Sequence, residues 1–433
     1  MSIKKEAIWI FGSTGISALS QIIVLILLSQ SEDVGVLGEL AIINIVLFFA
    51  FSLQDLGLSS YFIHRQSISK KEESTLFSIN LALGCLATII VFFLSIPIGV
   101  FYVSDNITKG LQIVAFNFII IGATSQYQAH FIKMLQSDLL AKIEIISKVI
   151  LLCFVLYFVY YLNMSLFGYL YAVLIGSAVK LLLILFISPV EWHPSFSFDK
   201  NIIKPALRFG FFQMGSQIIN QLRTQLDQLI IGKWLGIEAL GVYSLAKEFI
   251  MQPTKLIAPI TSKLALPRLA KVQTSVKGTK LIFNQASQAI LLLNMIVYLI
   301  LTIALYYLIP QFFGQDYIYS FEIYTTLLLV GLLRPIGSLF GVLAQSQGVS
   351  NIEFRWNLIS AMLSVVVLCL AFPFKTLEAF ALAMIGSQLL LSFYAPIYFS
   401  KYIGGIDHKK HLIRIVFIVF LYCIIKYSLP NEY

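Results

Sequence analysis

Apolar runs separated by short polar segments follow one another along the whole chain. A helix needs about 20 mostly apolar residues to cross the hydrocarbon core of a bilayer. Windows of roughly 18–25 residues predict helices at 8–29, 36–57, 76–102, 111–131, 143–162, 166–188, 205–231, 237–262, 281–309, 321–345, 356–373, 376–399 and 411–429. This pattern is typical of an all-α, polytopic membrane protein with about 12–13 transmembrane helices.

Basic residues alternate between the two sides of the predicted helices. Loops on the same side as the N-terminus carry clusters such as Lys263, Arg268 and Lys271, whereas the opposite loops carry single residues such as Lys109 and Lys375. Cytoplasmic loops of membrane proteins are enriched in Lys and Arg. The pattern therefore predicts a cytoplasmic N-terminus.

The composition also favours a membrane protein. Of 433 residues, 59% are hydrophobic and 12% are charged, whereas soluble domains are about 25% charged. The net charge of +9 is spread over many loops, which argues against nucleic-acid binding because such proteins gather Lys and Arg on one face. The four cysteines have no metal-ligand spacing, and no phosphate-binding loop is present. We therefore expect no cofactor.

Two halves are indicated by a proline-containing segment and by a short repeat. Pro189 and Pro194 lie in one of the longest loops, and the residues at 32–36 resemble those at 238–242. Shared turn chemistry explains so short a repeat as well as true duplication does. We predict two pseudo-symmetric six-helix lobes and a further helix: 1–190, a cytoplasmic linker at 191–204, 205–400, and 401–433.

The predicted helix at 205–231 carries a polar stripe. Its members recur at spacings of three and four and so share one face: Gln213, Gln217, Asn220, Thr224 and Asp227. Arg223 precedes Asp227 by four residues and can pair with it. Such a stripe lines either a water-filled cavity or a packed helix interface. We favour the cavity because the stripe includes ionisable groups, which are costly inside a bilayer.

Four further ionisable residues fall within predicted helices. Lys247 and Glu248 lie in the helix at 237–262, with Lys255 on the same face as Glu248. Two interpretations are open from the sequence alone: Glu248 and Lys255 form a structural pair, or Lys247 faces the substrate. Arg334, followed by Pro335, is a candidate cavity cation or a structural arginine at a kink. The histidines lie in or near predicted loops and are given no role.

Five segments of the chain resemble a known family. They include QDLGLSS at 54–60 and LDQLIIG at 226–232, and they span 54–66, 73–81, 226–246, 265–270 and 355–361. In order and spacing these segments are similar to the Wzx-type (WzxC-like) lipopolysaccharide and O-antigen flippases. That family belongs to the multidrug/oligosaccharidyl-lipid/polysaccharide exporter superfamily, which includes the MATE transporters.

The resemblance implies a MATE-like pair of six-helix lobes that work by alternating access in the bacterial cytoplasmic (inner) membrane. The expected cargo is an undecaprenyl-pyrophosphate-linked oligosaccharide, and a polysaccharide polymerase and chain-length proteins are expected partners. Arg223, Lys247 and Arg334, with the amides of Gln217 and Asn220, would bind the head group. Asp227 or Glu248 would bind a coupling H+ or Na+.

Two other functions are compatible with the helix pattern. A MATE-like exporter of small molecules has the same architecture, but an exporter of cations needs acidic rather than basic cavity walls. A membrane enzyme such as an O-antigen polymerase typically has a long extracytoplasmic loop or a soluble catalytic domain. No loop of this chain is longer than about twenty residues, which favours a transporter over an enzyme.

Overall fold

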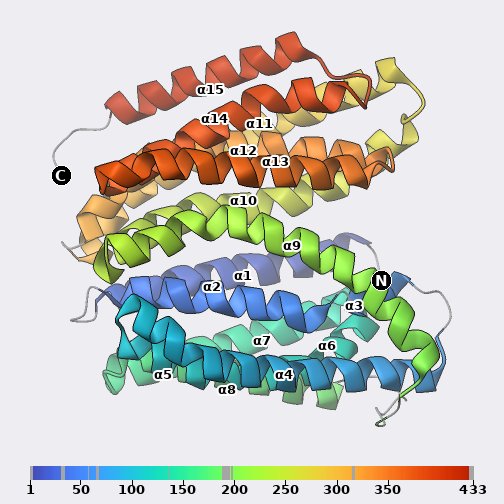
Figure 1. The fold of residues 1–433 in the computed structure, drawn as a ribbon, viewed down its shortest axis with the longest axis vertical. Helices are drawn as coiled ribbons and strands as arrows, with labels where there is room; N and C mark the ends of the chain where they lie inside the picture. Colours follow the sequence, from blue (N-terminus) through green and yellow to red (C-terminus); the bar gives the residue numbers. More distant parts are fainter. Residues whose placement is uncertain are drawn as a thin grey trace. The chain divides into compact units, whose positions relative to one another are not determined.

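The computed structural model describes residues 3–30, 35–56, 58–64, 68–134, 136–187, 196, 198–314 and 317–428. Within these ranges every regular element is a helix (Figure 1). The prediction of an all-α protein is therefore confirmed, and each predicted span falls on a helix.

By its internal contacts the chain divides into two compact units, unit 1 (Met1–Gln221) and unit 2 (Leu222–Tyr433). The division falls inside α9 (Lys200–Trp234), later in the chain than the predicted linker. Within that linker, 191–195 and 197 lie outside the described residues, and the part from Lys200 onward is helical. A helix, and not a loop, therefore carries the chain from one unit into the other.

Before α9, the described part of unit 1 consists of α1 (Ile3–Ser29), α2 (Val36–Asp55), α3 (Leu58–His64), α4 (Lys70–Tyr102), α5 (Asp105–Ala115), α6 (Asn117–Lys133), α7 (Ser137–Val155) and α8 (Ser165–Ile187). A π-helical turn, Leu156–Tyr161, extends α7. Helix α4 packs against α5 and α6, α1 packs against α7, and α7 packs against α8. The span predicted at 111–131 is interrupted at Phe116, between α5 and α6.

Helix α3 is missing from the prediction because its seven residues are too few to give a periodic pattern. Its side chains Leu58 and Phe62 are buried against Leu76 of α4, Ala129 of α6 and Ile202 of α9. This cluster holds one end of α4 and α6 together. Helix α4 begins with a capping box, in which Ser69 and Glu72 exchange hydrogen bonds between side chain and backbone.

After α9, the described part of unit 2 consists of α10 (Ile237–Lys271), α11 (Val276–Leu308), α12 (Ile318–Ser346), α13 (Ser350–Ala371), α14 (Leu377–Ser400) and α15 (His408–Ser428). A π-helical turn, Ile309–Phe313, follows α11, and a 3-10 turn, Phe372–Phe374, follows α13. Helix α12 contacts α10, α11, α13, α14 and α15, and most of its side chains are buried. It is the central helix of unit 2.

Nine helical segments of the described chain are long and apolar enough to cross a membrane. They are Gly12–Ser29, Lys70–Tyr102, Asp105–Lys133, Ser165–Ile187, Val276–Phe313, Ile318–Ser346, Asn351–Phe374, Leu377–Ser400 and His408–Ser428. The other four predicted spans form α2, α7, α9 and α10. Charged residues interrupt α7, α9 and α10, and the apolar part of α2 ends at Ser52.

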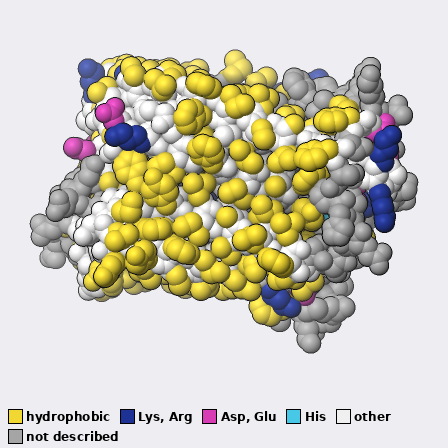
Figure 2. Space-filling model, turned by 90° about the horizontal axis from the view of Figure 1, so that it is seen from below, with side chains coloured by type: hydrophobic (Ala, Val, Ile, Leu, Met, Phe, Trp, Pro, Cys, Tyr) yellow, Lys and Arg dark blue, Asp and Glu magenta, His cyan; other side chains and the backbone are white. Residues whose placement is uncertain are grey.

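The surface of unit 1 fits a lipid environment. In Figure 2 hydrophobic side chains cover the face that is viewed, and the charged side chains lie toward its two ends. Exposed residues on α4 and α8 include Phe93 and Phe186, which are 66% and 84% exposed. So large an exposed apolar surface marks contact with a membrane or a partner, and the length of the helices indicates a membrane.

Candidate substrate-binding site

Asp227 and Lys247 form a buried ion pair between α9 and α10. The ammonium nitrogen of Lys247 lies 2.6 Å from Oδ1 and 2.8 Å from Oδ2 of Asp227. Lys247 also donates to the carbonyl oxygen of Thr224 at 2.5 Å, and the hydroxyl of Tyr243 donates to Asp227 Oδ2 at 2.7 Å. Asp227 is 0% exposed and Lys247 is 4% exposed. The two charges therefore neutralise each other away from solvent.

A short turn brings the two residues together. Helix α9 ends at Trp234 and α10 begins at Ile237, a connection short enough to make the two helices antiparallel neighbours. Gly236 in this turn has a φ of 97°, a conformation that other residues rarely adopt because of their Cβ. Asp227, about two turns before the end of α9, thereby comes to lie beside α10.

The predicted pairing of Asp227 with Arg223 is wrong. In the described part of the chain the carboxylate of Asp227 contacts Lys247 and Tyr243. Lys247 reaches both carboxylate oxygens from the neighbouring helix, and its strong charge-assisted hydrogen bonds take the place of a contact along α9. Tyr243, which the prediction missed, lies one turn before Lys247 on the same face of α10.

Arg334 brings a further cation to this region from α12. Its Nη1 lies 3.3 Å from Sδ of Met251 on α10. The guanidinium is also within electrostatic range of Arg223 and Asp227. Within the described part of the chain, no carboxylate forms an ion pair with Arg334. Its positive charge is therefore not locally neutralised by a salt bridge.

Pro335 and Asn294 account for the local geometry beside Arg334. Proline has no N–H, so the carbonyl four residues earlier, that of Gly331, loses its helical partner. The side-chain amide of Asn294 on α11 donates to the carbonyls of Gly331 and Leu332, at 3.2 and 2.9 Å. These carbonyl oxygens therefore receive their hydrogen bonds from another helix, and α12 remains continuous at Pro335. A proline inside an apolar helix is the signal that predicts such a donor.

Tyr298 of α11 contacts α10 about one turn beyond Lys247. Its hydroxyl donates to the carbonyl of Ile250 at 2.5 Å and lies 3.3 Å from the hydroxyl of Thr254. Ile250 is four residues before Thr254 and immediately precedes Met251, the contact of Arg334. The hydrogen bond therefore fixes the part of α10 that faces α12. Helix α10 runs unbroken through Pro253, although a proline inside a helix often breaks or kinks it.

Glu248 is occupied by two partners on its own helix. Lys255 donates to its Oε1 at 2.7 Å, and Gln252 donates to the same oxygen at 2.6 Å. The side chain of Lys255 is 57% exposed. The interpretation as a structural Lys–Glu pair is confirmed. The suggestion that Glu248 binds a coupling ion stays a prediction.

The two predicted amides lie earlier on α9. Asn220 is exposed, and the side chain of Gln217 lies outside the described residues. Their role in binding stays a prediction. Among the described residues of unit 2, Asp227 neutralises Lys247, Glu248 is paired with Lys255, and Arg334 has no salt bridge. The charge of Arg334 therefore suits an anionic ligand.

His130 and His411 lie close to helix ends, as expected, but both side chains are buried. His130, near the end of α6, is buried with its Nδ1 2.8 Å from Oε1 of Glu73 on α4. His411, in the first turn of α15, is 3% exposed and contacts the carbonyl of Ser392 at 3.0 Å. His193 lies outside the described residues. Both buried histidines hold helices together, and the group at Glu73–His130 is considered further below.

The family match covers Asp227 and Lys247 and ends before Arg334. A family model described as "Polysaccharide biosynthesis protein" matches residues 27–322, which is more than half of the chain. The chain belongs to this family.

Two proteins that are named for polysaccharide synthesis are similar over most of this chain. The amylovoran biosynthesis protein AmsL of Erwinia amylovora is 36% identical over 349 residues, 81% of this chain and 90% of AmsL. The lipopolysaccharide biosynthesis protein WzxC of Escherichia coli (strain K12) is 24% identical over 87% of this chain and 77% of WzxC. The resemblance to WzxC-like proteins found in the sequence is therefore confirmed.

Solved structures confirm the architecture expected for this family. An inward-facing multidrug resistance MATE family transporter of the MOP superfamily has a TM-score of 0.74 at 14% identity, over 93% of this chain and 95% of that one. The lipid II flippase MurJ in an inward closed conformation has the same TM-score and identity, over 100% of this chain and 94% of MurJ. The MATE-like, multi-pass membrane fold is thus established.

Proposed function

We propose that this protein is a flippase, and not an enzyme, that moves an undecaprenyl-pyrophosphate-linked oligosaccharide repeat unit across the bacterial cytoplasmic membrane. The repeat unit would serve the synthesis of a surface polysaccharide such as O-antigen. Family membership and the names of AmsL and WzxC support a role in polysaccharide synthesis. The observation that carries the proposal is the positive charge of Arg334, which has no salt bridge among the described residues and lies in a helix that buries mostly apolar side chains.

The cargo and these side chains match chemically. A pyrophosphate carries negative charge and several acceptor oxygens, and a guanidinium offers several N–H donors in a fixed plane. Arg223 and Arg334 bind the head group in our proposal, with Gln217 and Asn220 donating to sugar or phosphate oxygens. Leaving an arginine without a carboxylate partner inside a membrane protein is costly. That cost is offset when an anionic ligand supplies the missing charge.

Coupling to H+ or Na+ belongs to the same proposal. Asp227 is the stronger candidate because its carboxylate neutralises Lys247 through both oxygens. A proton bound to Asp227 would leave the ammonium of Lys247 with its full charge, next to Arg334. Binding of the ion and of an anionic head group would then favour each other. Glu248, held by Lys255 and Gln252, is the second candidate.

Topology and partners follow from the same function. The N-terminus lies in the cytoplasm, so that the side rich in Lys and Arg faces the compartment in which the lipid-linked unit is made. Alternating access carries the head group across while the lipid tail stays in the bilayer. A polysaccharide polymerase and chain-length proteins act on the unit after translocation.

A small-molecule exporter has a related fold, as the MATE transporter shows. Fold alone does not separate the two functions. The positive charge of Arg334 favours an anionic cargo, because an exporter of cationic drugs needs acidic residues to bind them. The relatives with sequence similarity are named for polysaccharide synthesis.

Deletion of the gene tests the flippase function. Surface polysaccharide and lipid-linked intermediates would be measured in the deletion strain and in the strain complemented with the wild-type gene. We expect surface polymer to be lost and complete repeat units to accumulate on the cytoplasmic leaflet. Arrival of single repeat units at the outer leaflet would refute the flippase. A surface capped with one unpolymerised unit indicates a polymerase, and altered drug resistance with normal polymer indicates an exporter.

A further inference from the structure

Three amide side chains are buried in unit 1 with polar atoms that have no protein partner. Gln54 on α2, Asn80 on α4 and Gln126 on α6 are 2%, 1% and 0% exposed. Both polar atoms of Asn80, both of Gln126 and Oε1 of Gln54 lack a hydrogen-bond partner among the described residues. Unpaired polar atoms are costly in an apolar interior, and three amides in one interface therefore require an explanation.

The three amides lie in the interface between α2, α4 and α6. A Cβ placed on Gly122 of α6 would lie 3.3 Å from Nε2 of Gln54 and 2.7 Å from the carbonyl oxygen of Asn80. Gln126 lies one turn after Gly122 on the same face of α6. Gly84, one turn after Asn80, comes equally close to the backbone of α6, at Phe118. The glycines let the helices approach, and the amides occupy the interface beside them.

The interface ends at the Glu73–His130 pair. His130 lies one turn after Gln126 on α6, and Glu73 lies about two turns before Asn80 on α4. The pair is therefore the next polar contact along the same two helices, with its nitrogen and oxygen 2.8 Å apart. Phe62 stacks on the His130 ring at 6.1 Å, and Lys133 lies over Phe62 at 4.3 Å. These side chains cover the pair on the side of α3.

The unpaired atoms determine which ligand fits. They include the amide nitrogens of Asn80 and Gln126, which donate, as well as three amide oxygens, which accept. A metal cation would satisfy the oxygens alone. No group of three or more His, Cys, Asp or Glu side chains suited to a metal occurs among the described residues. Water donates and accepts, and buried water characteristically bridges polar groups that lack other partners.

We propose that α2, α4 and α6 enclose a cluster of internal water molecules bound by Gln54, Asn80 and Gln126. These waters reach the Glu73–His130 pair and give it a route for proton exchange, although both side chains are buried. The site lies wholly in unit 1 and uses none of the cations of the substrate-binding site. It can therefore be tested without any transport assay.

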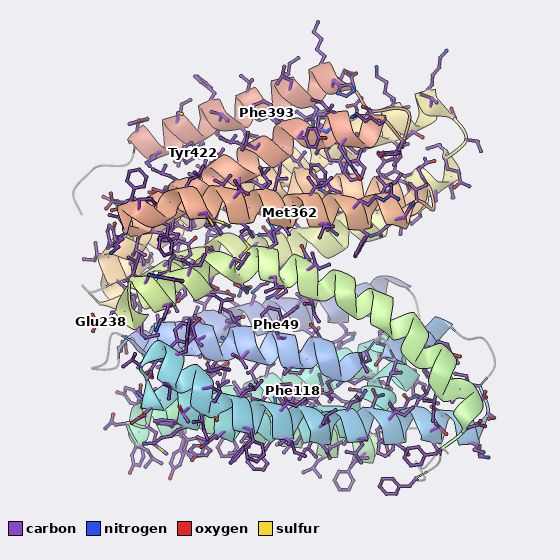
Figure 3. All side chains as sticks on the ribbon, viewed as in Figure 1. Phe49, Phe118, Glu238, Met362, Phe393 and Tyr422 are labelled. Atoms are coloured by element: carbon purple, nitrogen blue, oxygen red, sulfur yellow. The ribbon has the colours of Figure 1, made fainter. Side chains whose placement is uncertain are left out.

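Radiolytic hydroxyl labelling tests the water. Internal water near a side chain is converted by X-rays into hydroxyl radical, which labels that side chain in place. Phe118 lies in this interface (Figure 3) and is 0% exposed. Phe249 and Phe313 of unit 2, a ring pair with 2% and 1% exposure, are the matched controls. We expect Phe118 in the intact protein in lipid nanodiscs to be labelled at least several times faster than both controls.

A variant with apolar side chains tests the binding residues. Asn80→Leu with Gln126→Met removes the polar partners at similar volume, and labelling of Phe118 should fall to the control rate. Equal labelling of Phe118 and the controls in the wild type would overturn the proposal, whether or not the variant folds. Labelling that persists in a folded variant would also overturn it. Labelling that changes when Na+ replaces choline in the buffer would assign the site to a cation instead.

Exchange of the C2 hydrogen of histidine tests whether water reaches the Glu73–His130 pair. This exchange is slow, needs contact with solvent and is read for each histidine by mass spectrometry. His411 is the comparison, because it is buried at 3% and its Nε2 lies 3.0 Å from the carbonyl oxygen of Ser392. We expect His130 to exchange several times faster than His411, and to slow toward it in the apolar variant. Equal rates in the wild type, or an unchanged His130 rate in the variant, would refute the route.

Discussion

The ammonium nitrogen of Lys247 lies within 2.8 Å of both carboxylate oxygens of Asp227, and both residues are almost fully buried. Such a pair contributes little net stability, because each charge gives up its hydration. Each residue nevertheless depends on the other, since either charge alone would be buried without compensation. The pair therefore behaves as a unit in both stability and function.

Breaking this pair should be more harmful than removing it. Asp227→Asn leaves an uncompensated ammonium, and we expect a loss of about 3–5 kcal/mol of stability. The double variant Asp227→Leu with Lys247→Met should recover most of the loss. Thermal unfolding of the purified proteins in one detergent measures both effects. Lys255→Met, which breaks the exposed pair with Glu248, is the control and should cost less than about 1 kcal/mol. Equal losses in the single and double variants would contradict the coupling.

Removal of the charge at Arg334 should impair transport more than folding. A charge-assisted hydrogen bond to phosphate is worth about 1.5–3 kcal/mol, so Arg334→Gln should slow translocation by roughly 10- to 100-fold. Arg334→Lys keeps the charge and should retain part of the activity. Translocation of lipid-linked repeat units in the complemented deletion strain is the measurement, with protein levels checked by immunoblot. Lys180→Gln, which removes the ammonium that lies 3.5 Å from the carboxylate of Glu144 in unit 1, is the charge-matched control. A normal rate for Arg334→Gln would remove Arg334 from the site.

Two glycines on α12 should respond differently to the same substitution. A Cβ on Gly331 would lie 2.6 Å from the ring and hydroxyl of Tyr298, whereas one on Gly337 would have its nearest neighbour at 3.9 Å. Gly331→Ala therefore forces Tyr298 away from Ile250, and we expect a loss of about 1–3 kcal/mol. Gly337→Ala should be neutral or slightly stabilising, because alanine favours helix. Unfolding midpoints in detergent compare the two, and similar values would contradict the close contact.

Low pH should lower the stability of the part of unit 2 in which α15 begins. The backbone N–H of Lys410 and the ammonium of Lys280 lower the pKa of Asp407 below its ordinary value of 3.8. Because the folded pKa is lowered, the contribution is present above 3.8 and is lost as pH falls through the folded value. Asp407→Asn should thus be less stable than wild type near neutral pH. The difference should shrink in the acid range, as measured by unfolding midpoints against pH, and a constant difference would contradict this assignment.

The apolar pattern was sufficient to predict nearly every helix, because the bilayer requires each span to be apolar and to satisfy its own hydrogen bonds. The prediction failed where an element is short or interrupted. Seven residues of α3 give no periodic signal, and no proline or glycine marks the break at Phe116. The predicted boundary between the halves relied on Pro189 and Pro194, whereas the division by contacts falls within a helix.

The sequence singled out the charged residues of the candidate site but not their pairing. Charges inside apolar runs identified Asp227, Lys247 and Arg334, because such charges are rare unless something compensates them. Helical spacing then suggested Arg223 as the partner of Asp227. The actual partner comes from another helix, which spacing along one helix cannot reveal. The same is true of Asn294, whose role depends on a carbonyl freed by Pro335, and of His130, which faces Glu73 from α6.

The charged character of α9 and α10 has a consequence for the biogenesis of the protein. Charged residues, among them Asp227 and Lys247, interrupt both helices, and insertion of each central charge costs roughly 2.5–3.5 kcal/mol. Leu235 and Gly236 alone separate the two helices. The translocon is therefore expected to release α9 and α10 into the lipid as a hairpin, with Asp227 and Lys247 already joined. If translation stalls after α9 has been made and before α10 has been made, we expect α9 to remain outside the bilayer.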